Sequence, residues 1–167
     1  MSQNRPLADV VATAVAAHGR EPGPLLAVLQ AVVAELGHVP DAAIRPIAQA
    51  LNLSRAEVHG VISFYHDLRT EPPGRVQAKV CRAEACQAVG ATSVLAEAAG
   101  RLGVTVGGTR EDGALTLDEV FCLGNCALGP SALIDGRLHG RLTADRLTGL
   151  IEERIAGAGD RDPAVTR

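Results

Sequence analysis

The chain has 167 residues, a net charge of −3 and aromatic side chains at only 2% of its positions. A chain of this length can bury a real core without disulfides. It has no cluster of Lys or Arg to neutralise phosphates and few rings on which bases could stack, so a nucleic-acid partner is not expected. It also lacks the apolar run of about 18 residues that a membrane span needs, and its N-terminal stretch MSQNRPLADVVATAVAAHGR does not resemble a signal peptide. We therefore expect a cytoplasmic protein with no direct membrane contact.

The N-terminal part of the chain has a helical pattern. Apolar residues recur at helical spacing in PLADVVATAVAAHG, PLLAVLQAVVAELGHVP, DAAIRPIAQALN and SRAEVHGVISFY. Gly37 is typical of a helix end, and Ser54 with Glu57 three residues later has the pattern of a capping box. The pattern predicts an N-terminal helical domain, residues 1–70, without strands.

The segment DLRTEPPGR interrupts this pattern, because two prolines and a glycine favour an extended linker or turn. After it, RVQAKVC alternates like a strand, and EACQAVGATSVLAEAAGRLG reads as one helix. The following VTVGGTREDGALTLDEVFC predicts two strands around an Asp112-Gly113 turn. The loop LGNCALGP comes next, then a short strand SALID, a turn at Gly136 and a last helix from Thr143 through Ile155.

This order of elements, with one crossover followed by antiparallel pairing, predicts an α/β fold for residues 71–156. We expect a short mixed sheet covered by helices. Residues 157–167 are small and polar, which is typical of a flexible tail.

All four cysteines belong to one pattern, C-x4-C followed after 35 residues by C-x3-C. Cys81 and Cys86 lie where a predicted strand meets a predicted helix, and Cys122 and Cys126 lie in a glycine-bearing loop between strands. In a small α/β domain these two turns can lie at the same edge of the sheet. We therefore take Cys81, Cys86, Cys122 and Cys126 as the candidate metal ligands and cofactor-binding residues.

Other roles for cysteine fit this pattern less well. Buried free cysteines are common as small hydrophobes, but these pairs lie in loops, and disulfides are uncommon in a reducing compartment. Structural zinc is the main competitor, although its sites usually have C-x2-C knuckles and often His ligands, and no His lies within five residues of any Cys here. A catalytic cysteine needs a base placed beside it, which nothing in the sequence singles out, so we predict no catalytic residue.

A [2Fe-2S] cluster takes four thiolates, and wide ligand loops suit its two-iron core. A Rieske centre would need two His near the cysteines. Because a cluster with four thiolates is negatively charged, we expect main-chain N–H groups aimed at sulfur, with Gly124 and Gly129 allowing the close approach. Cys86, in the first turn of a predicted helix, is expected to meet the positive end of its dipole. Arg82 is a nearby positive charge whose simplest role is that of a solvated surface side chain.

The cysteine spacing and its surroundings resemble one known family, the thioredoxin-like [2Fe-2S] ferredoxin subunits of NADH dehydrogenases (complex I) and their relatives in NAD-linked hydrogenases and formate dehydrogenases. The similar segments are GHVP, VHGVISFYHDLRTEPPG, VCRAEACQAVGA and EVFCLGNCALGPSALIDGRLHGRLT, which extend over nearly the whole chain. CRAEACQ and CLGNCALGPS resemble most the gamma subunit of cytoplasmic, NAD-dependent formate dehydrogenases that contain molybdenum or tungsten.

The resemblance implies a helical unit followed by a thioredoxin-like domain that carries one [2Fe-2S] cluster. It also implies an electron-transfer subunit that exchanges single electrons with a flavin- and NAD-binding iron–sulfur beta subunit, in a complex whose molybdenum- or tungsten-containing alpha subunit oxidises formate. FMN, NAD, further Fe–S clusters and the molybdenum or tungsten cofactor are then expected on those partners only. The alternative is the equivalent subunit of complex I or of an NAD-linked hydrogenase.

The residues themselves indicate no substrate site, since the chain has no G-x-G-x-x-G after a strand and no P-loop. We therefore expect an oxidoreductase subunit without a complete active site of its own. A rival hypothesis is a dithiol enzyme or a zinc-stabilised module of thioredoxin-like fold. A dithiol enzyme usually has C-x2-C at a helix start, which this chain lacks.

Overall fold

The computed structural model describes residues 5–158. The chain divides into two compact units, one ending at Pro72 and the other beginning at Pro73, within the Pro-Pro-Gly segment. Of the expected C-terminal tail, residues 159–167 lie outside the described residues. Among the helices of residues 5–158, none combines the length and apolar character needed to cross a membrane.

The first unit is helical, as the sequence pattern predicts. Its helices are α1 (Leu7–His18), α2 (Leu25–Leu36), α3 (Asp41–Leu51) and α4 (Arg55–Phe64), and its described residues contain no strand. α2 ends at Gly37, whose φ of 78° lies in the left-handed region that glycine tolerates best. The predicted capping box of α4 is present, because Glu57 N–H donates to Ser54 Oγ at 3.2 Å and Ser54 N–H donates to a Glu57 carboxylate oxygen at 2.8 Å.

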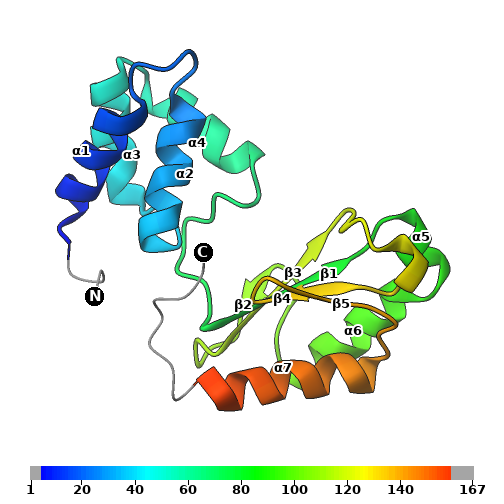
Figure 1. Cartoon of the computed structure of the whole chain (residues 1–167). Coiled ribbons are helices and arrows are strands. Elements are labelled where there is room, and N and C mark those ends of the chain that lie inside the picture. The colour runs from blue at the N-terminus through cyan, green and yellow to red at the C-terminus, as the bar shows by residue number, and fades with distance from the viewer. Residues whose placement is uncertain (1–4, 159–167) are drawn as a thin grey trace. The chain divides into compact units, whose positions relative to one another are not determined.

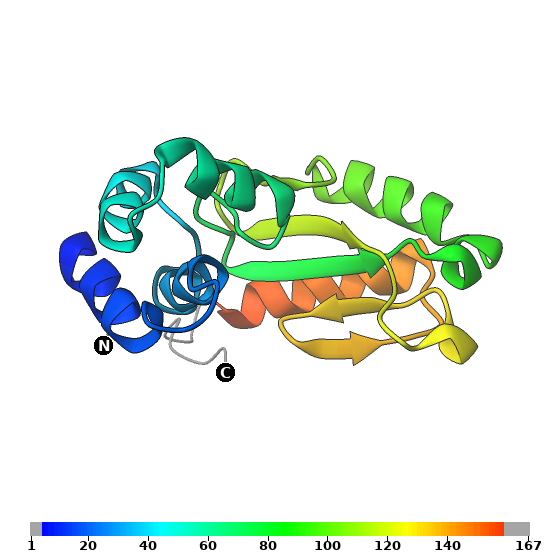
Figure 2. The ribbon, with the colours of Figure 1, turned by 90° about the horizontal axis from the view of Figure 1, so that it is seen from above.

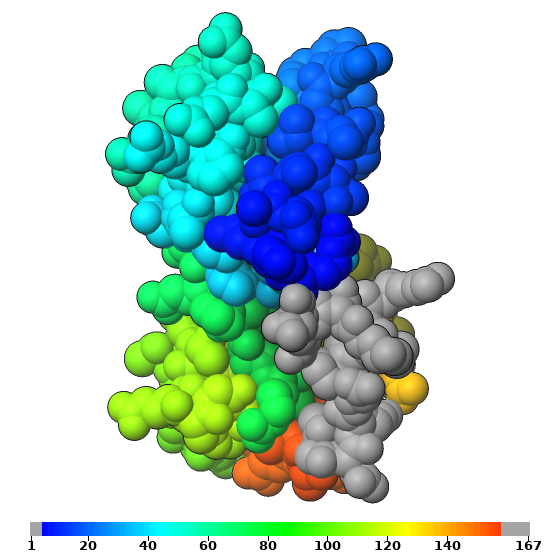
Figure 3. All heavy atoms as spheres, turned by 90° about the vertical axis from the view of Figure 1, so that its left-hand side faces the viewer, coloured from blue at the N-terminus to red at the C-terminus, as the bar shows by residue number. Residues whose placement is uncertain are grey.

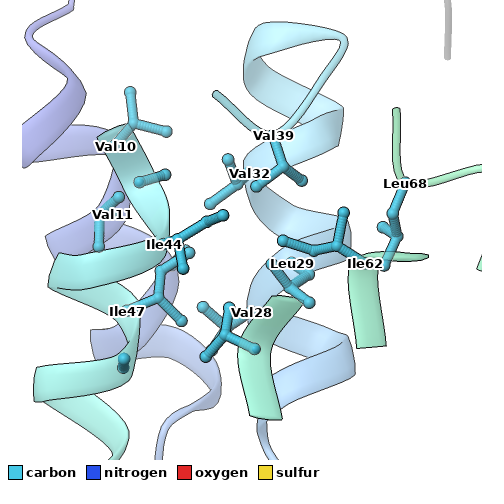
Figure 4. Close-up of a cluster of buried hydrophobic side chains, with 14 residues drawn as sticks. Val10, Val11, Val28, Leu29, Val32, Val39, Ile44, Ile47, Ile62 and Leu68 are labelled. Carbon is cyan, nitrogen blue, oxygen red and sulfur yellow. The ribbon is translucent and has the colours of Figure 1, made fainter. Parts of the chain in front are cut away.

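Aliphatic side chains fill the centre of this helical unit and point toward one another from all four helices (Figure 4). Val28, Leu29 and Val32 lie along one side of α2 and are fully shielded from solvent. Burial of each such side chain contributes about 1.5–3 kcal/mol to folding. α1 packs against both α2 and α3, and Figure 3 shows the outer surface of α1 in blue next to that of α3 in cyan. This unit therefore has a core of its own.

The second unit is built on a mixed sheet, as expected for an α/β fold. Its strands are β1 (Val76–Cys81), β2 (Gly108–Thr109), β3 (Leu115–Val120), β4 (Ala132–Ile134) and β5 (Arg137–His139), in the order β2-β3-β1-β4-β5. β1 runs parallel to β3 and antiparallel to β4, while β2 and β5 add antiparallel edges (Figure 2). β1 is thus the central strand.

Two helices cover one face of this sheet. α6 (Ala91–Leu102) and α7 (Ala144–Ala158) pack against each other and both pack against β1 (Figure 1). The alternating side chains of the strands meet them there: Val76, Ala78 and Val80 of β1 are fully buried, as are Leu115 and Leu117 of β3. The unit also contains a short helix α5 (Glu84–Ala88) and a one-turn 3-10 helix η1 (Cys126–Leu128).

Three details of the second unit differ from the sequence prediction. The single helix expected after Cys81 is two helices, because Gly90 takes a φ of 90° and breaks the chain direction between α5 and α6. The strand expected to begin at Val104 is instead a bend, with Gly107 at a φ of 84°, followed by the two-residue β2. The last helix continues past the expected Ile155 to Ala158.

Candidate iron–sulfur site

The sheet topology brings the two cysteine pairs to one end of the second unit. Cys81 is the last residue of β1 and pairs with Val120, the last residue of the parallel strand β3. The chain leaves β1 toward α5, which carries Cys86, and leaves β3 into the loop that carries Cys122 and then Cys126 at the start of η1. Because parallel strands end at the same edge, α5 and η1 lie side by side there (Figures 1 and 2). The two cysteine loops lie at the same edge of the sheet as expected, while the role of the four cysteines as ligands stays a prediction.

Hydrogen bonds and close approaches link the loop of Cys81 and Cys86 to the loop of Cys122 and Cys126. The Cys86 thiol donates a hydrogen bond to the Cys81 sulfur, which also accepts from the main-chain N–H groups of Leu123 and Cys122. Cys126 lies close enough to Cys86 for an electrostatic interaction between the two side chains. Each cysteine of the second loop is therefore linked to one cysteine of the first.

The first pair is buried and the second is exposed. Cys81 and Cys86 are 2% and 1% accessible, whereas Cys122 and Cys126 face solvent. Burial alone would raise the pKa of Cys81, but hydrogen bonds led by that from the Ala83 N–H overcome it, and its pKa lies below the usual value. Burial and then the bond to Cys81 raise the pKa of Cys86, against the opposing effect of the Ser131 N–H.

The two glycines of the second loop bring main chain close to sulfur, as the sequence indicates. Gly124 has a φ of 74°, and its N–H donates to the Cys122 sulfur at 3.4 Å. A Cβ placed on Gly129 would lie 3.3 Å from the Cys86 sulfur. Cys122 itself has a φ of 88°, a conformation that non-glycine residues seldom adopt and that is concentrated at ligand sites. The backbone conformation of this loop thus places main-chain atoms close to the cysteine sulfurs.

One electrostatic expectation stays untested and one needs correction. Cys86 lies in the first turn of α5, as expected, but burial and then the bond to Cys81 raise the pKa of its thiol, so an effect of the helix dipole on this thiol stays a prediction. Arg82 is not simply solvated, because its Nη1 lies 2.8 Å from a carboxylate oxygen of Glu119 and its side chain is only 31% exposed. The carboxylate of Glu119 therefore offsets the positive charge of Arg82 beside the site.

Ser131 is the site residue that the sequence reasoning missed. It is fully buried, its carbonyl oxygen accepts the Cys81 N–H at 2.9 Å, and its own N–H points at the Cys86 sulfur and lowers the pKa of that thiol. One main-chain unit therefore contacts both residues of the first pair. The sequence signal is a small polar residue at the start of an apolar strand, directly after the second cysteine loop.

The donor set fits an iron–sulfur cluster. The cysteines supply four thiols, and main-chain N–H groups from three segments of the chain already point at their sulfurs. Such donors suit a negatively charged cofactor that extends over two irons. Within residues 5–158, no three side chains of His, Cys, Asp or Glu, these cysteines included, form a group that could hold a metal ion.

Comparisons with known proteins point to the same cofactor. The sequence matches the profile of the thioredoxin-like [2Fe-2S] ferredoxin family over residues 11–154, which includes most of both units. It is 37% identical over 127 residues to the E-type subunit of the NADH-quinone oxidoreductase of Pseudomonas aeruginosa, covering 76% of each chain. It is 28% identical over 131 residues to the NADP-reducing hydrogenase subunit HndA of Solidesulfovibrio fructosivorans, covering 78% of this chain and 77% of that one.

A solved structure extends the similarity to the fold. The crystal structure of an NAD+-reducing [NiFe]-hydrogenase in the air-oxidized state superposes with a TM-score of 0.65 and 28% sequence identity, over 80% of this chain. The chain spans only 23% of the hydrogenase chain that it matches. Because the family profile extends over most of the chain and the Pseudomonas aeruginosa relative is 37% identical, this protein belongs to the thioredoxin-like [2Fe-2S] ferredoxin family, whose cofactor is one [2Fe-2S] cluster.

Proposed function

We propose that this chain is the electron-transfer subunit of an NAD(H)-linked oxidoreductase complex and that Cys81, Cys86, Cys122 and Cys126 hold its [2Fe-2S] cluster. The observation that carries the proposal is the meeting of both cysteine loops at one edge of the sheet, with main-chain N–H groups directed at the sulfurs. When bound, the cluster would supply a one-electron couple. The chain's own part is to bind it and to surround it with fixed hydrogen-bond donors.

The relatives favour complex I or a hydrogenase over a formate dehydrogenase as the complex. Those reported above are a subunit of an NADH-quinone oxidoreductase and subunits of hydrogenases that reduce NADP or NAD+. They therefore support the alternative considered from the sequence better than the formate dehydrogenase gamma subunit. The formate dehydrogenase gamma subunit is therefore the second candidate. It rests on the resemblance of CRAEACQ and CLGNCALGPS, the segments that contain the cysteines.

Exposed apolar side chains around the cysteines support assembly into a complex. Val89, Phe121 and Leu128 lie in or next to the loops of the site, and they are 55%, 67% and 41% exposed. Apolar side chains grouped at a surface are typical of a protein–protein contact. We propose that a flavin- and NAD-binding subunit covers this surface in the cytoplasm, and that FMN, NAD and further Fe–S clusters belong to that subunit. A formate-oxidising molybdenum or tungsten subunit is expected only with the second candidate.

Anaerobic reconstitution of the full chain with iron and sulfide tests the cluster. We expect two irons and two sulfides per chain, red-brown absorbance, and an electron paramagnetic resonance (EPR) signal after one-electron reduction. A colourless protein that holds one zinc per chain would contradict the proposal, and one that cycles two thiols without binding iron would favour the dithiol alternative. Parallel reconstitution of single Cys→Ser variants at the four positions would identify the ligands.

Purification of the native complex tests its identity. We expect the chain to copurify with a flavin-containing, NAD-binding subunit, together with either quinone-reducing or hydrogen-oxidising subunits. Copurification with a molybdenum- or tungsten-containing subunit that oxidises formate would select the second candidate. Isolation of the intact chain as a lone protein, with its cluster bound, would contradict assembly into a complex.

A further inference from the structure

The loop of Cys126 is tied to the strand that follows it by a buried polar contact. The side-chain amide of Asn125 donates to Ser131 Oγ at 3.0 Å, and Ser131 is completely buried. The Ser131 hydroxyl is also within 3.4 Å of the carbonyl oxygens of Asn125 and Leu128. One hydroxyl thus contacts both ends of the turn that contains Cys126.

The segment after β5 contacts the same turn. Gly140 lies so close that a Cβ on it would be 2.7 Å from the Leu128 carbonyl oxygen and 2.8 Å from the Asn125 Nδ2 atom. The next residue, Arg141, donates its main-chain N–H to that carbonyl at 2.6 Å. The Asn125 amide therefore contacts a buried hydroxyl and lies against the main chain of a glycine.

Ser131 also contacts the other cysteine pair. Its carbonyl oxygen accepts the Cys81 N–H, and its N–H is directed at the Cys86 sulfur. A displacement of Ser131 would therefore change the position of its N–H relative to the Cys86 sulfur, and also the position of the turn that contains Cys126. The hydrogen bond of the Asn125 amide goes to Ser131 and not to a cysteine, so its side chain acts on the cluster through the position of Ser131 and of the turn.

We propose that Asn125, Ser131 and Gly140 form a clamp that fixes the Cys126 turn and sets the reduction potential of the cluster. The clamp, which we call the Asn125 clamp, consists of positioning residues and rests on the proposed function, because it requires the cluster to be bound at the four cysteines. Reduction adds one electron to a cofactor that is already negative, so N–H groups aimed at sulfur stabilise the reduced form more than the oxidised form. A loosened clamp weakens these contacts and moves the potential to more negative values.

Reduction potentials of the reconstituted full chain test this clamp. Asn125→Ala and Ser131→Ala would be compared with the wild type by redox titration followed by visible absorbance and EPR. Thr148→Ala is the matched control: Thr148 is also buried, and its hydroxyl bonds to the Ala144 carbonyl at 2.9 Å within α7. This substitution removes a buried, hydrogen-bonded hydroxyl from the same unit and changes no residue of the clamp.

We expect both clamp variants to retain a two-iron cluster, with a potential more negative than that of the wild type and changed EPR g-values, and Thr148→Ala to match the wild type. Wild-type potentials and EPR spectra in both clamp variants would overturn the clamp and leave the proposed function standing. An equal shift in Thr148→Ala would also overturn it, since general destabilisation would then explain the effect. If Ser131→Ala does not fold, Asn125→Ala decides, because this half-buried side chain lies in a surface turn. A wild-type chain that binds no two-iron cluster would overturn the proposed function and the clamp with it.

Discussion

Gly129→Ala tests whether the Cys86 sulfur packs tightly against Gly129 in the second cysteine loop. Gly129 has a φ of −63° and a ψ of 158°, which any L-residue can adopt, so the change adds one methyl group and no backbone strain. That methyl group would lie 3.2 Å from Val89 Cγ2 and 3.3 Å from Cys86 Sγ. Both distances are a few tenths of an ångström too short for comfortable van der Waals contact.

The expected cost follows from which neighbour can move. Val89 is 55% exposed and can shift toward solvent, whereas Cys86 is 1% exposed and is enclosed by the protein. We therefore expect the apoprotein to lose about 1 kcal/mol of stability, the low end of the range for an overpacked methyl group. Because Cys86 is enclosed, the added methyl group would press on its sulfur, so we expect a changed visible spectrum and EPR signal of the reconstituted protein, or a lower cluster content.

Urea unfolding of the apoprotein measures the first effect, and iron analysis with EPR of the reconstituted protein measures the second. Gly149→Ala is the control, because Gly149 lies within α7 and a Cβ there meets no atom within 4 Å. It should raise stability by about 0.5–1 kcal/mol through helix propensity and leave the cluster spectra unchanged. A Gly129→Ala protein with wild-type stability and wild-type spectra would refute the packing argument.

Three further changes are expected to have separable effects. Cys122→Ser should remove or severely perturb the cluster while far-ultraviolet circular dichroism shows the helical unit still folded; unchanged spectra and activity would remove Cys122 from the ligand set. Ser54→Ala should cost about 1 kcal/mol of unfolding free energy in urea. The Ser54 hydroxyl also donates to the Glu57 carboxylate and, after the Ser54 main-chain N–H, lowers the pKa of that group, so the cost of Ser54→Ala should be larger above the ordinary Glu pKa and should decrease as the pH falls through the lowered value; a cost that grows on acidification would contradict this. Burial and then the charge of Arg146 lower the pKa of His139, so the unfolded state binds the proton first and stability should fall as the pH drops below the ordinary His pKa; His139→Gln should flatten that part of the stability–pH curve.

The parts of the fold that could be predicted are those that local chemistry determines. The capping box at Ser54 and the left-handed Gly37 act within one helix end, so their sequence patterns are sufficient. The break at Gly90 was missed because good helix-forming residues lie on both sides of it, and a single glycine inside such a pattern is often tolerated. The two-residue β2 exists through its pairing with β3, which is a tertiary contact that no local pattern encodes.

The candidate site shows the same division between local and long-range information. Spacing alone indicates the four candidate cysteines and the nearby Gly124 and Gly129, because these lie in two short stretches of sequence. The contact of Ser131 with both Cys81 and Cys86 depends on β4 lying directly beside β1, and the sheet order could not be derived from the order of the strands along the chain. The enclosure of Asn125 by Gly140 likewise requires the β4–β5 hairpin to fold back onto the loop.

The parallel pairing of β1 with β3 has a consequence for how the protein matures. In an unfolded chain the two cysteine pairs are separated by 35 residues, so neither pair alone offers a four-thiolate site. The site exists only after β1 has found β3, a non-local contact that forms late compared with the local helices. If the four cysteines hold the cluster as proposed, its insertion requires that β1 already pairs with β3. The bound cluster would then stabilise the second unit against unfolding, because it would bind the folded form and not the separated pairs.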